Sequence, residues 1–245
     1  MEWLGNSGGS NHEGYYLYGI ERTGVASGRR TFGGHDWFAE GVRAALDSQQ
    51  ATGHFALGGH GGPLGNAAFA ALFMVYGGAP TAYNKLEYGE GQDWNLNPRD
   101  LANVAKHLWS AYERPLNWSS VSIASPASAF EAPILFISGS RALSFKDTEA
   151  ATLKAYAEAG GTLLLEATDG SKAFADSVEA FLRQMYTVKD YPAYKLQPLA
   201  DDHPAFTVIK QDWKQRPKLR GASDGSRTFF LVSDEIGRAS CRERV

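Results

Sequence analysis

Polar residues stand directly after two apolar runs in the second half of the sequence, at positions that suit ligand binding. Ser138 and Gly139 follow the first run, and Glu166 and Asp169 follow the second. An open α/β sheet binds its ligands at the carboxyl ends of its strands. Backbone amides at Gly139 and Gly170, near helix N-termini, suit an anion, and the two carboxylates suit acid–base or metal chemistry.

The same residue types also have purely structural uses. Serine and aspartate are typical of helix N-caps and turns, and we favour this interpretation for Ser140, Ser144, Asp169 and Ser171. Asp202 and His203 suggest a metal site or a general base, because histidine titrates near neutrality. A turn stabilised by Asp202 and Pro204 is the favoured alternative.

Several catalytic classes lack their required residues in this sequence. The only cysteine is Cys241, and it lies in a tail that we exclude below, so a thiol nucleophile and cysteine-bound zinc are not expected. No HxH or HExxH spacing occurs. Asp169-Gly170-Ser171 is not the Gly-x-Ser-x-Gly turn of serine hydrolases, and 58–63 has no lysine of a phosphate loop. We therefore predict no metal and no cofactor.

The end of the chain, Glu235–Val245, has neither helical nor strand periodicity. It back-translates without mismatch into a string that resembles a common sequencing adapter, and such segments are excluded from fold reasoning. We expect the natural protein to continue beyond Asp234 and to begin before Met1.

Composition indicates an ordinary globular protein. The 245 residues are 43% hydrophobic and 21% charged, which allows one large domain or two small ones. The formal net charge of -3, without a basic run, argues against a nucleic-acid partner. No apolar stretch is long enough to span a bilayer. A small molecule or another protein remains as partner.

The first 80 residues predict helices separated by glycine-rich loops. The expected helices cover 15–23, 36–50 with Asp36 as N-cap, and 66–76 with Asn66 as N-cap. The last is apolar on all sides, so other helices must surround it, and we expect these upstream of Met1. Residues 1–80 are therefore interpreted as a fragment of an all-helical repeat domain, and 81–97 as a linker.

Residues 98–234 predict an α/β domain. Its first helix should begin with Asn97 as N-cap and Pro98 at the first position. The runs 134–137 and 162–165 flank a helix that a capping box at Ser144 opens, which is the pattern of a βαβ unit. Both runs lack polar alternation, so helices should cover both faces of the sheet. A further helix after Ser171 and strands at 121–123 and 228–232 predict a small doubly wound domain.

The helical part resembles the repeat of terpenoid cyclases and prenyltransferases, which fold as an α/α toroid. The resemblance lies in Gly41, Gln49 or Gln50, Gly53 and Phe55. In that repeat the glutamine ties down a helix end and an aromatic residue packs beside it. Here Phe55 replaces the usual tryptophan, and neither the aspartate-rich acid nor the zinc ligands of those enzymes occur.

The second part resembles the bacterial family called domain of unknown function 4159. The resemblance covers 132–138, 149–166, Asp202-His203-Pro204 and 221–233, within about 96–234. It implies a flavodoxin-like, class I glutamine amidotransferase-like fold. It also implies export, and hence a place in the periplasm or cell envelope.

Two functional hypotheses follow. The first is a non-catalytic ligand- or partner-binding protein of the bacterial cell envelope. The alternative is an enzyme, of prenyltransferase or terpenoid cyclase type or a cysteine-less amidotransferase or hydrolase relative. The hydrolase version requires Glu166, Asp169 and His203 to converge in one cleft. Carbohydrate binding is a third idea, which requires exposed tryptophans among Trp94, Trp118 and Trp213 to share a face.

Overall fold

The computed structural model describes residues 13–58, 62–91, 93–126, 129–187, 194–208 and 216–234. It divides into two compact units, Met1–Tyr83 with Pro98–Ser120, and Asn84–Asn97 with Val121–Val245. Within the described ranges, no helix is both long and apolar enough to cross a membrane. The tail 235–245, together with His60 and Trp213, lies outside the described residues.

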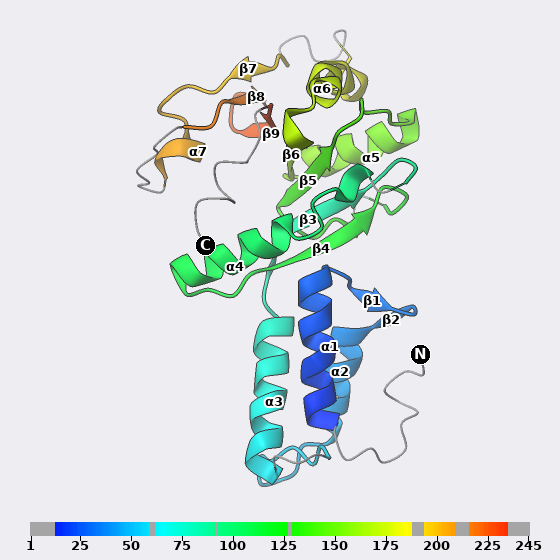
Figure 1. Cartoon of the computed structure of the whole chain (residues 1–245), viewed down its shortest axis with the longest axis vertical. Coiled ribbons are helices and arrows are strands. Elements are labelled where there is room, and N and C mark those ends of the chain that lie inside the picture. Colours follow the sequence, from blue (N-terminus) through cyan, green and yellow to red (C-terminus); the bar gives the residue numbers. More distant parts are fainter. Residues whose placement is uncertain are drawn as a thin grey trace. The chain divides into compact units, whose positions relative to one another are not determined.

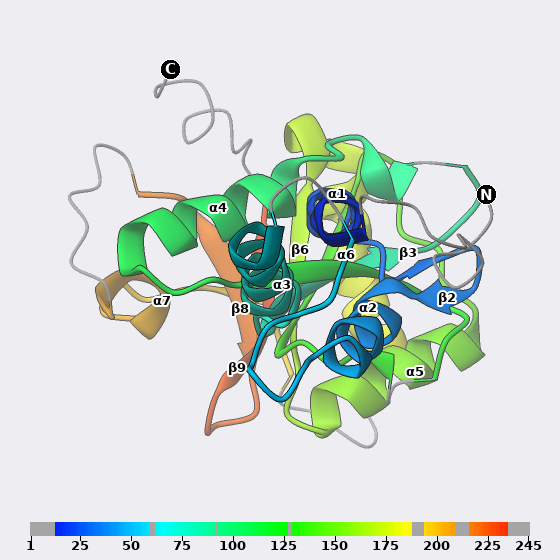
Figure 2. The same ribbon diagram turned by 90° about the horizontal axis from the view of Figure 1, so that it is seen from below.

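The first unit is mainly helical. Helices α1 (Glu13–Ser27), α2 (Trp37–Asp47) and α3 (Gly62–Gly77) pack on one another, and α4 (Asp100–Tyr112) contacts α1 (Figure 1). Figure 2 views the first three nearly along their axes. A short hairpin of β1 (Thr31–Phe32) and β2 (His35–Asp36) precedes α2. The buried core consists of Leu17, Trp37, Leu57, Ala70 and Phe73.

The N-caps of the first unit are predicted with mixed success. Asp36 caps α2 as predicted, because its carboxylate accepts hydrogen bonds from the amides of Phe38 and Ala39 at 3.1 and 2.9 Å. The prediction for Asn66 is wrong: α3 begins four residues earlier, at Gly62. The buried Asn66 amide instead donates a hydrogen bond to the carbonyl of Leu57.

A seven-stranded sheet has the order β4-β3-β5-β6-β9-β8-β7. Its strands are β3 (Thr81–Glu87), β4 (Asn117–Ser122), β5 (Ile134–Gly139), β6 (Thr162–Ala167), β7 (Gln197–Pro198), β8 (Leu219–Ser223) and β9 (Thr228–Ser233). Strands β5, β6 and β9 pair in parallel, and β8 is antiparallel to both of its neighbours. Helices flank this mixed sheet, an arrangement compatible with a doubly wound fold.

The predicted βαβ unit is confirmed. Ile134 pairs with Thr162 and Ile137 with Leu165, so the two apolar runs lie side by side in parallel. Helix α5 (Asp147–Glu158) connects them, and Gly160, at φ +106°, follows its end. The helix begins at Asp147 rather than near Ser144, because Glu149 accepts the amide of Lys146 at 2.8 Å.

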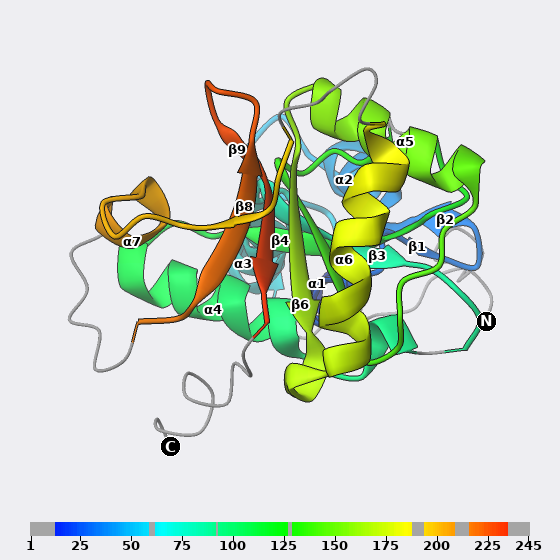
Figure 3. The same cartoon turned by 90° about the horizontal axis from the view of Figure 1, so that it is seen from above.

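Helix α6 (Lys172–Met185) packs beside α5 on one face of the sheet, as Figure 3 shows. Its buried stripe is the predicted one: Phe174, Val178, Phe181, Leu182 and Met185. These side chains form one core with Leu135, Ile137, Leu163 and Leu165. The predicted helical cover is thus confirmed for this face. On the opposite face Leu164 and Leu231 are only partly buried.

The structure places a strand where the sequence predicts a linker. Within 81–97, β3 spans Thr81–Glu87 and a 3-10 turn, η2, spans Asp93–Asn95. The strand lacks an apolar signature because two of its three buried residues are Asn84 and Lys85. The predicted start of the next helix is also wrong: α4 begins at Asp100, after an Arg99 cap that makes no side-chain hydrogen bond.

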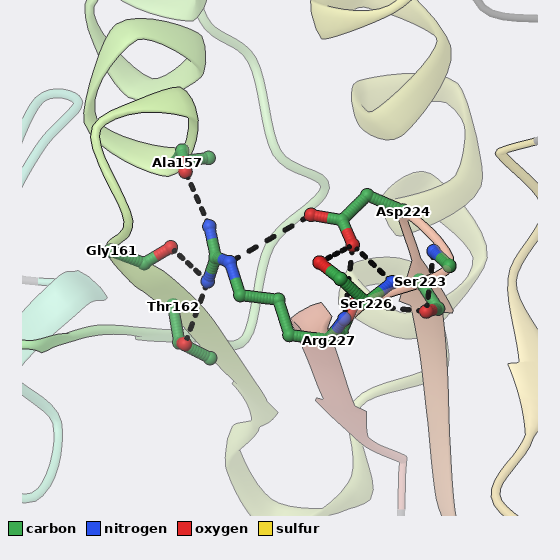
Figure 4. A network of polar contacts seen from close by, with 8 residues as sticks. Ala157, Gly161, Thr162, Ser223, Asp224, Ser226 and Arg227 are labelled. Atoms are coloured by element: carbon green, nitrogen blue, oxygen red, sulfur yellow. Dashed lines mark hydrogen bonds and ion pairs between the residues drawn. The ribbon is translucent and has the colours of Figure 1, made fainter.

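Arg227 ties the β8–β9 hairpin to the end of α5 (Figure 4). Its guanidinium donates hydrogen bonds to the carbonyls of Ala157 and Gly161 at 2.5 and 3.0 Å, and to the Thr162 hydroxyl at 3.3 Å. Carbonyls at a helix end need such donors. Asp224 shapes the hairpin turn, since its carboxylate accepts hydrogen bonds from Ser226 and the Arg227 amide, and these lower its pKa to about 2.

We expect Arg227→Ala to lower the free energy of unfolding by about 1–3 kcal/mol, because it removes three hydrogen bonds that a partly buried guanidinium donates to the end of α5 and the start of β6. Urea denaturation followed by circular dichroism measures this change. Arg183→Ala is the matched control: it removes an exposed pair with Glu179, for which about 0.5 kcal/mol or less is expected. Equal effects of the two substitutions would contradict the role given to Arg227.

Candidate functional site

The candidate site lies where β3 and β5 are neighbours in the sheet. From β3 the chain passes to β4 on one side, and from β5 it passes to β6 on the other. Strand β4 runs in the same direction as β3, because the Asn117 amide bonds Pro80 and the Ile123 amide bonds Glu87. Such a reversal of strand order opens a crevice at the carboxyl ends of the strands, where doubly wound proteins bind their ligands.

The carboxylate of Asp93 accepts hydrogen bonds from the backbone amides that directly follow β5. It accepts hydrogen bonds from the Ser140 amide at 3.0 Å, the Arg141 amide at 3.2 Å and the Ser140 hydroxyl at 2.6 Å. Successive amides that point at one oxygen form an anion-binding concavity, or nest. The loop after β5 therefore holds an anion, as its sequence suggests, but the anion belongs to the same chain.

Tyr88 and Ser138 form further hydrogen bonds between the end of β5 and the segment that carries Asp93. The Tyr88 hydroxyl donates to the carbonyl of Ser138 at 2.9 Å, and the Ser138 hydroxyl donates to the carbonyl of Trp94 at 3.1 Å. A side chain on Gly139 would clash, since its Cβ would lie 2.5 Å from the Tyr88 hydroxyl and 2.7 Å from Asp93 Oδ2. Glycine at 139 is thus required for this close approach.

Lys85 holds the segment that carries Asp93. Its ammonium donates hydrogen bonds to the Asn95 side chain at 3.1 Å and to the Asn97 carbonyl at 2.9 Å. It also lies 6.0 Å from the centre of the Trp94 ring, within the range of a cation–π contact. Lys85 is fully buried, so this polar network belongs to the interior rather than to the surface.

The electrostatics agree with an ionised Asp93. Burial acts to raise the pKa of its carboxyl, but the hydrogen bonds from Ser140 and Arg141, with the Arg141 charge, outweigh burial and lower the pKa overall. Burial, aided by the charge of Asp93, raises the pKa of the neighbouring Tyr88 hydroxyl well above its usual range. At neutral pH the site therefore contains a carboxylate and a neutral phenol.

The four predicted residues of this edge differ in their roles. Ser138 and Gly139 lie in the site, whereas Glu166 is partly buried at the end of β6, beside Ser138 in register. Asp169 is exposed and has left-handed backbone angles, φ 54° and ψ 24°, which are uncommon outside glycine. Ser171 is a helix cap, as favoured, and its hydroxyl bonds the carbonyl of Ser140.

Asp202 and His203 lie near the start of β9, at the other end of the strands from Glu166. His203 Nδ1 accepts the Ala205 amide at 3.1 Å, and Nε2 lies 2.9 Å from the hydroxyl of Thr228, the first residue of β9. In the parallel register Phe230 pairs with Leu163 and Ser233 with Glu166, so Thr228 is about 16 Å along the strands from Glu166. Glu166, Asp169 and His203 therefore do not converge in one cleft, as the hydrolase alternative requires.

The His203 ring acts as a structural cap. With Nδ1 accepting a backbone amide, the proton of a neutral ring lies on Nε2, which then donates to Thr228. Such a ring is not placed to remove a proton from that hydroxyl. Among the described residues, no cluster of three or more histidine, cysteine, aspartate or glutamate side chains could hold a metal.

Sequence reasoning missed Tyr88, Lys85 and Asp93, because all three lie in the predicted linker. The one signal was a tyrosine, an aspartate and a tryptophan on either side of Gly89 and Gly91, without an apolar run beside them. The carbohydrate idea does not hold for Trp118, which is only 5% exposed and cannot contribute to an exposed aromatic face.

Fold and site together define an α/β domain in which the crevice between β3 and β5 is occupied by the chain's own carboxylate. The chain belongs to the family described as Domain of unknown function (DUF4159), whose model matches residues 83–236. The matched range includes every residue of the crevice from Tyr88 to Arg141. No curated protein matches the chain.

We expect Asp93→Asn to lower the free energy of unfolding at pH 7 by about 1–2 kcal/mol, because it removes a charge that accepts three hydrogen bonds. The folded-state pKa of Asp93 is lowered, so its stabilising effect is full above the ordinary value of about 3.9 and is lost as pH falls below it. The difference between wild type and variant should therefore shrink below about pH 4.

Urea denaturation at several pH values measures this difference. Asp176→Asn is the control, since Asp176 is exposed and forms an ion pair with Lys172 of the same helix. If the difference between wild type and Asp93→Asn does not change with pH, or matches that of the control, the stabilising role of Asp93 is refuted.

Proposed function

We propose that this protein is a non-catalytic ligand- or partner-binding protein of the bacterial cell envelope. The observation that carries the proposal is the Asp93 carboxylate on the amides of Ser140 and Arg141. In an enzyme of this fold, the crevice has to admit a substrate. Here the chain itself fills the place where the charged part of a substrate would bind.

The physical argument is one of competition. A carboxylate attached to the same chain acts at an effective concentration in the millimolar range or above, so a free anion has to exceed it. Displacing Asp93 would also disturb Tyr88 and the Lys85 network, which hold the same segment. A site from which Asp93 must first be displaced is poorly suited to the rapid turnover of a substrate. The crevice then serves structure, and binding takes place on other surfaces.

The finer structural assignments are also part of this proposal. We assign the α/β part a flavodoxin-like, glutamine amidotransferase-like fold, supported by the position of β3 between β4 and β5. We assign residues 1–80 to a fragment of an α/α toroid. An isolated bridge between Gln49 and Phe55 and a 3.5 Å hydrogen bond from the Gln49 amide to the Gly53 carbonyl support that assignment. The envelope location rests on the family resemblance.

Nuclear magnetic resonance with acetate and phosphate as probes tests the closed crevice. In wild type, we expect the amide signals of Ser140 and Arg141 to be insensitive to millimolar acetate or phosphate. In Asp93→Ala the same two signals should shift with either anion, because their acceptor is gone. Asp176→Ala is the control and should behave as wild type.

The enzyme hypothesis makes the opposite prediction. If the Ser140 and Arg141 signals of wild type shift as strongly as those of Asp93→Ala, the crevice is open to anions and the non-catalytic proposal fails. The location is tested separately, by fractionating cells that express the complete gene; recovery in the cytosol alone would contradict it.

A further inference from the structure

A cavity lies within the first unit. Its volume is about 160 Å³, comparable with one small ring compound. Three aromatic residues, Trp37, Phe38 and Trp118, contribute to its walls, and the charged residues Arg29, Arg30 and Asp36 also line it. Trp37 and Trp118 are almost fully buried, whereas both arginines are exposed.

Glycines allow the aromatic rings to form these walls. Gly28, at φ +66°, lies so close to the Trp118 ring that a Cβ would be 2.5 Å from it, and a Cβ on Gly24 would be 2.4 Å from the Trp37 ring. Gly77 stands against the Phe38 ring in the same way. All three glycines line the cavity, so these positions, two in helices and one after α1, have a specific packing role.

The charge at the cavity is positive. Arg30 and Asp36 oppose one another, with 3.9 Å between Nε and Oδ2. Asp36 is further engaged as the cap of α2. The Arg29 guanidinium forms no hydrogen bond or ion pair within the described part of the chain. Its backbone is nevertheless fixed, because the Trp37 indole donates a 2.6 Å hydrogen bond to the Arg29 carbonyl.

Trp118 forms part of the cavity wall. Its indole Nε1 is buried and finds no acceptor among the described residues. A ligand in the cavity would therefore contact the Trp118 ring rather than its N–H group.

We propose that this cavity binds a small ring-containing organic monoanion, of the class of aromatic carboxylates. The aromatic walls, which include the Trp118 ring, receive the ring of the ligand, and Arg29 pairs with its carboxylate. Arginine suits this task because its planar fork matches a carboxylate. The proposal does not depend on the closed crevice of the α/β part.

Benzoate is the probe, titrated into the full chain and followed by calorimetry and by the indole N–H signals in nuclear magnetic resonance. We expect the Trp118 indole signal, assigned by its loss in Trp118→Phe, to shift with benzoate. Arg29→Gln should weaken binding about tenfold, since a hydrogen bond to a charged group is lost. Arg43→Gln, a change at an exposed residue of α2 that does not line the cavity, should have no effect.

Neutral benzamide and inorganic phosphate separate the two parts of the recognition. Both should bind at least about tenfold more weakly than benzoate, because one lacks the charge and the other the ring. An unmoved Trp118 indole signal, equal affinities of Arg29→Gln and Arg43→Gln, or equal binding of benzoate and phosphate would each overturn the proposal.

Discussion

Strands β5 and β6 pair in parallel along their whole length, and this pairing determines where the polar groups of the second unit lie. The pairing runs in register from Ile134 with Thr162 to Gly139 with Ala167. Because both strands then end at one edge, the loops that follow them share that edge. Helices α5 and α6 cover the apolar side chains on one face of these strands. The polar groups that could bind a ligand lie at the ends of the strands.

At that edge the chain uses its own groups where a binding protein of this architecture would admit a ligand. Asp93 accepts the amides of Ser140 and Arg141, and Gly139 leaves the space for it. The fully buried Lys85 fixes the segment that bears this carboxylate. Buried polar groups need their partners, since an unsatisfied one is costly. The Asp93 carboxylate, the Lys85 ammonium and the backbone groups that they contact therefore satisfy one another in one polar network.

The helical unit follows a different principle, in which glycine and aromatic residues pack in contact. Rings of Trp37, Phe73 and Trp118 stand against Gly24, Gly41 and Gly28 respectively, at distances that exclude a Cβ. Such packing brings backbone and ring close together and leaves few polar groups within. The cavity that Trp118 lines departs from this, because Arg29, Arg30 and Asp36 also line it.

The sequence by itself determined the elements with an apolar period. The strands at 134–137 and 162–165, the buried stripe of α6 and the Asp36 cap follow from local patterns, because burial leaves a direct trace in residue type.

Only the tertiary structure decided which polar residues meet. Strand β3 has no apolar pattern, because two of its buried residues are Asn84 and Lys85. Their side chains form hydrogen bonds with residues 132, 95 and 97, which no local pattern connects. For the same reason Asp93 was missed, and the strand register separates His203 from Glu166, which the hydrolase alternative requires to converge. Hydrogen bonds between distant segments depend on the path of the backbone, whereas apolar periodicity depends on neighbours in the chain, and a single sequence carries only the second.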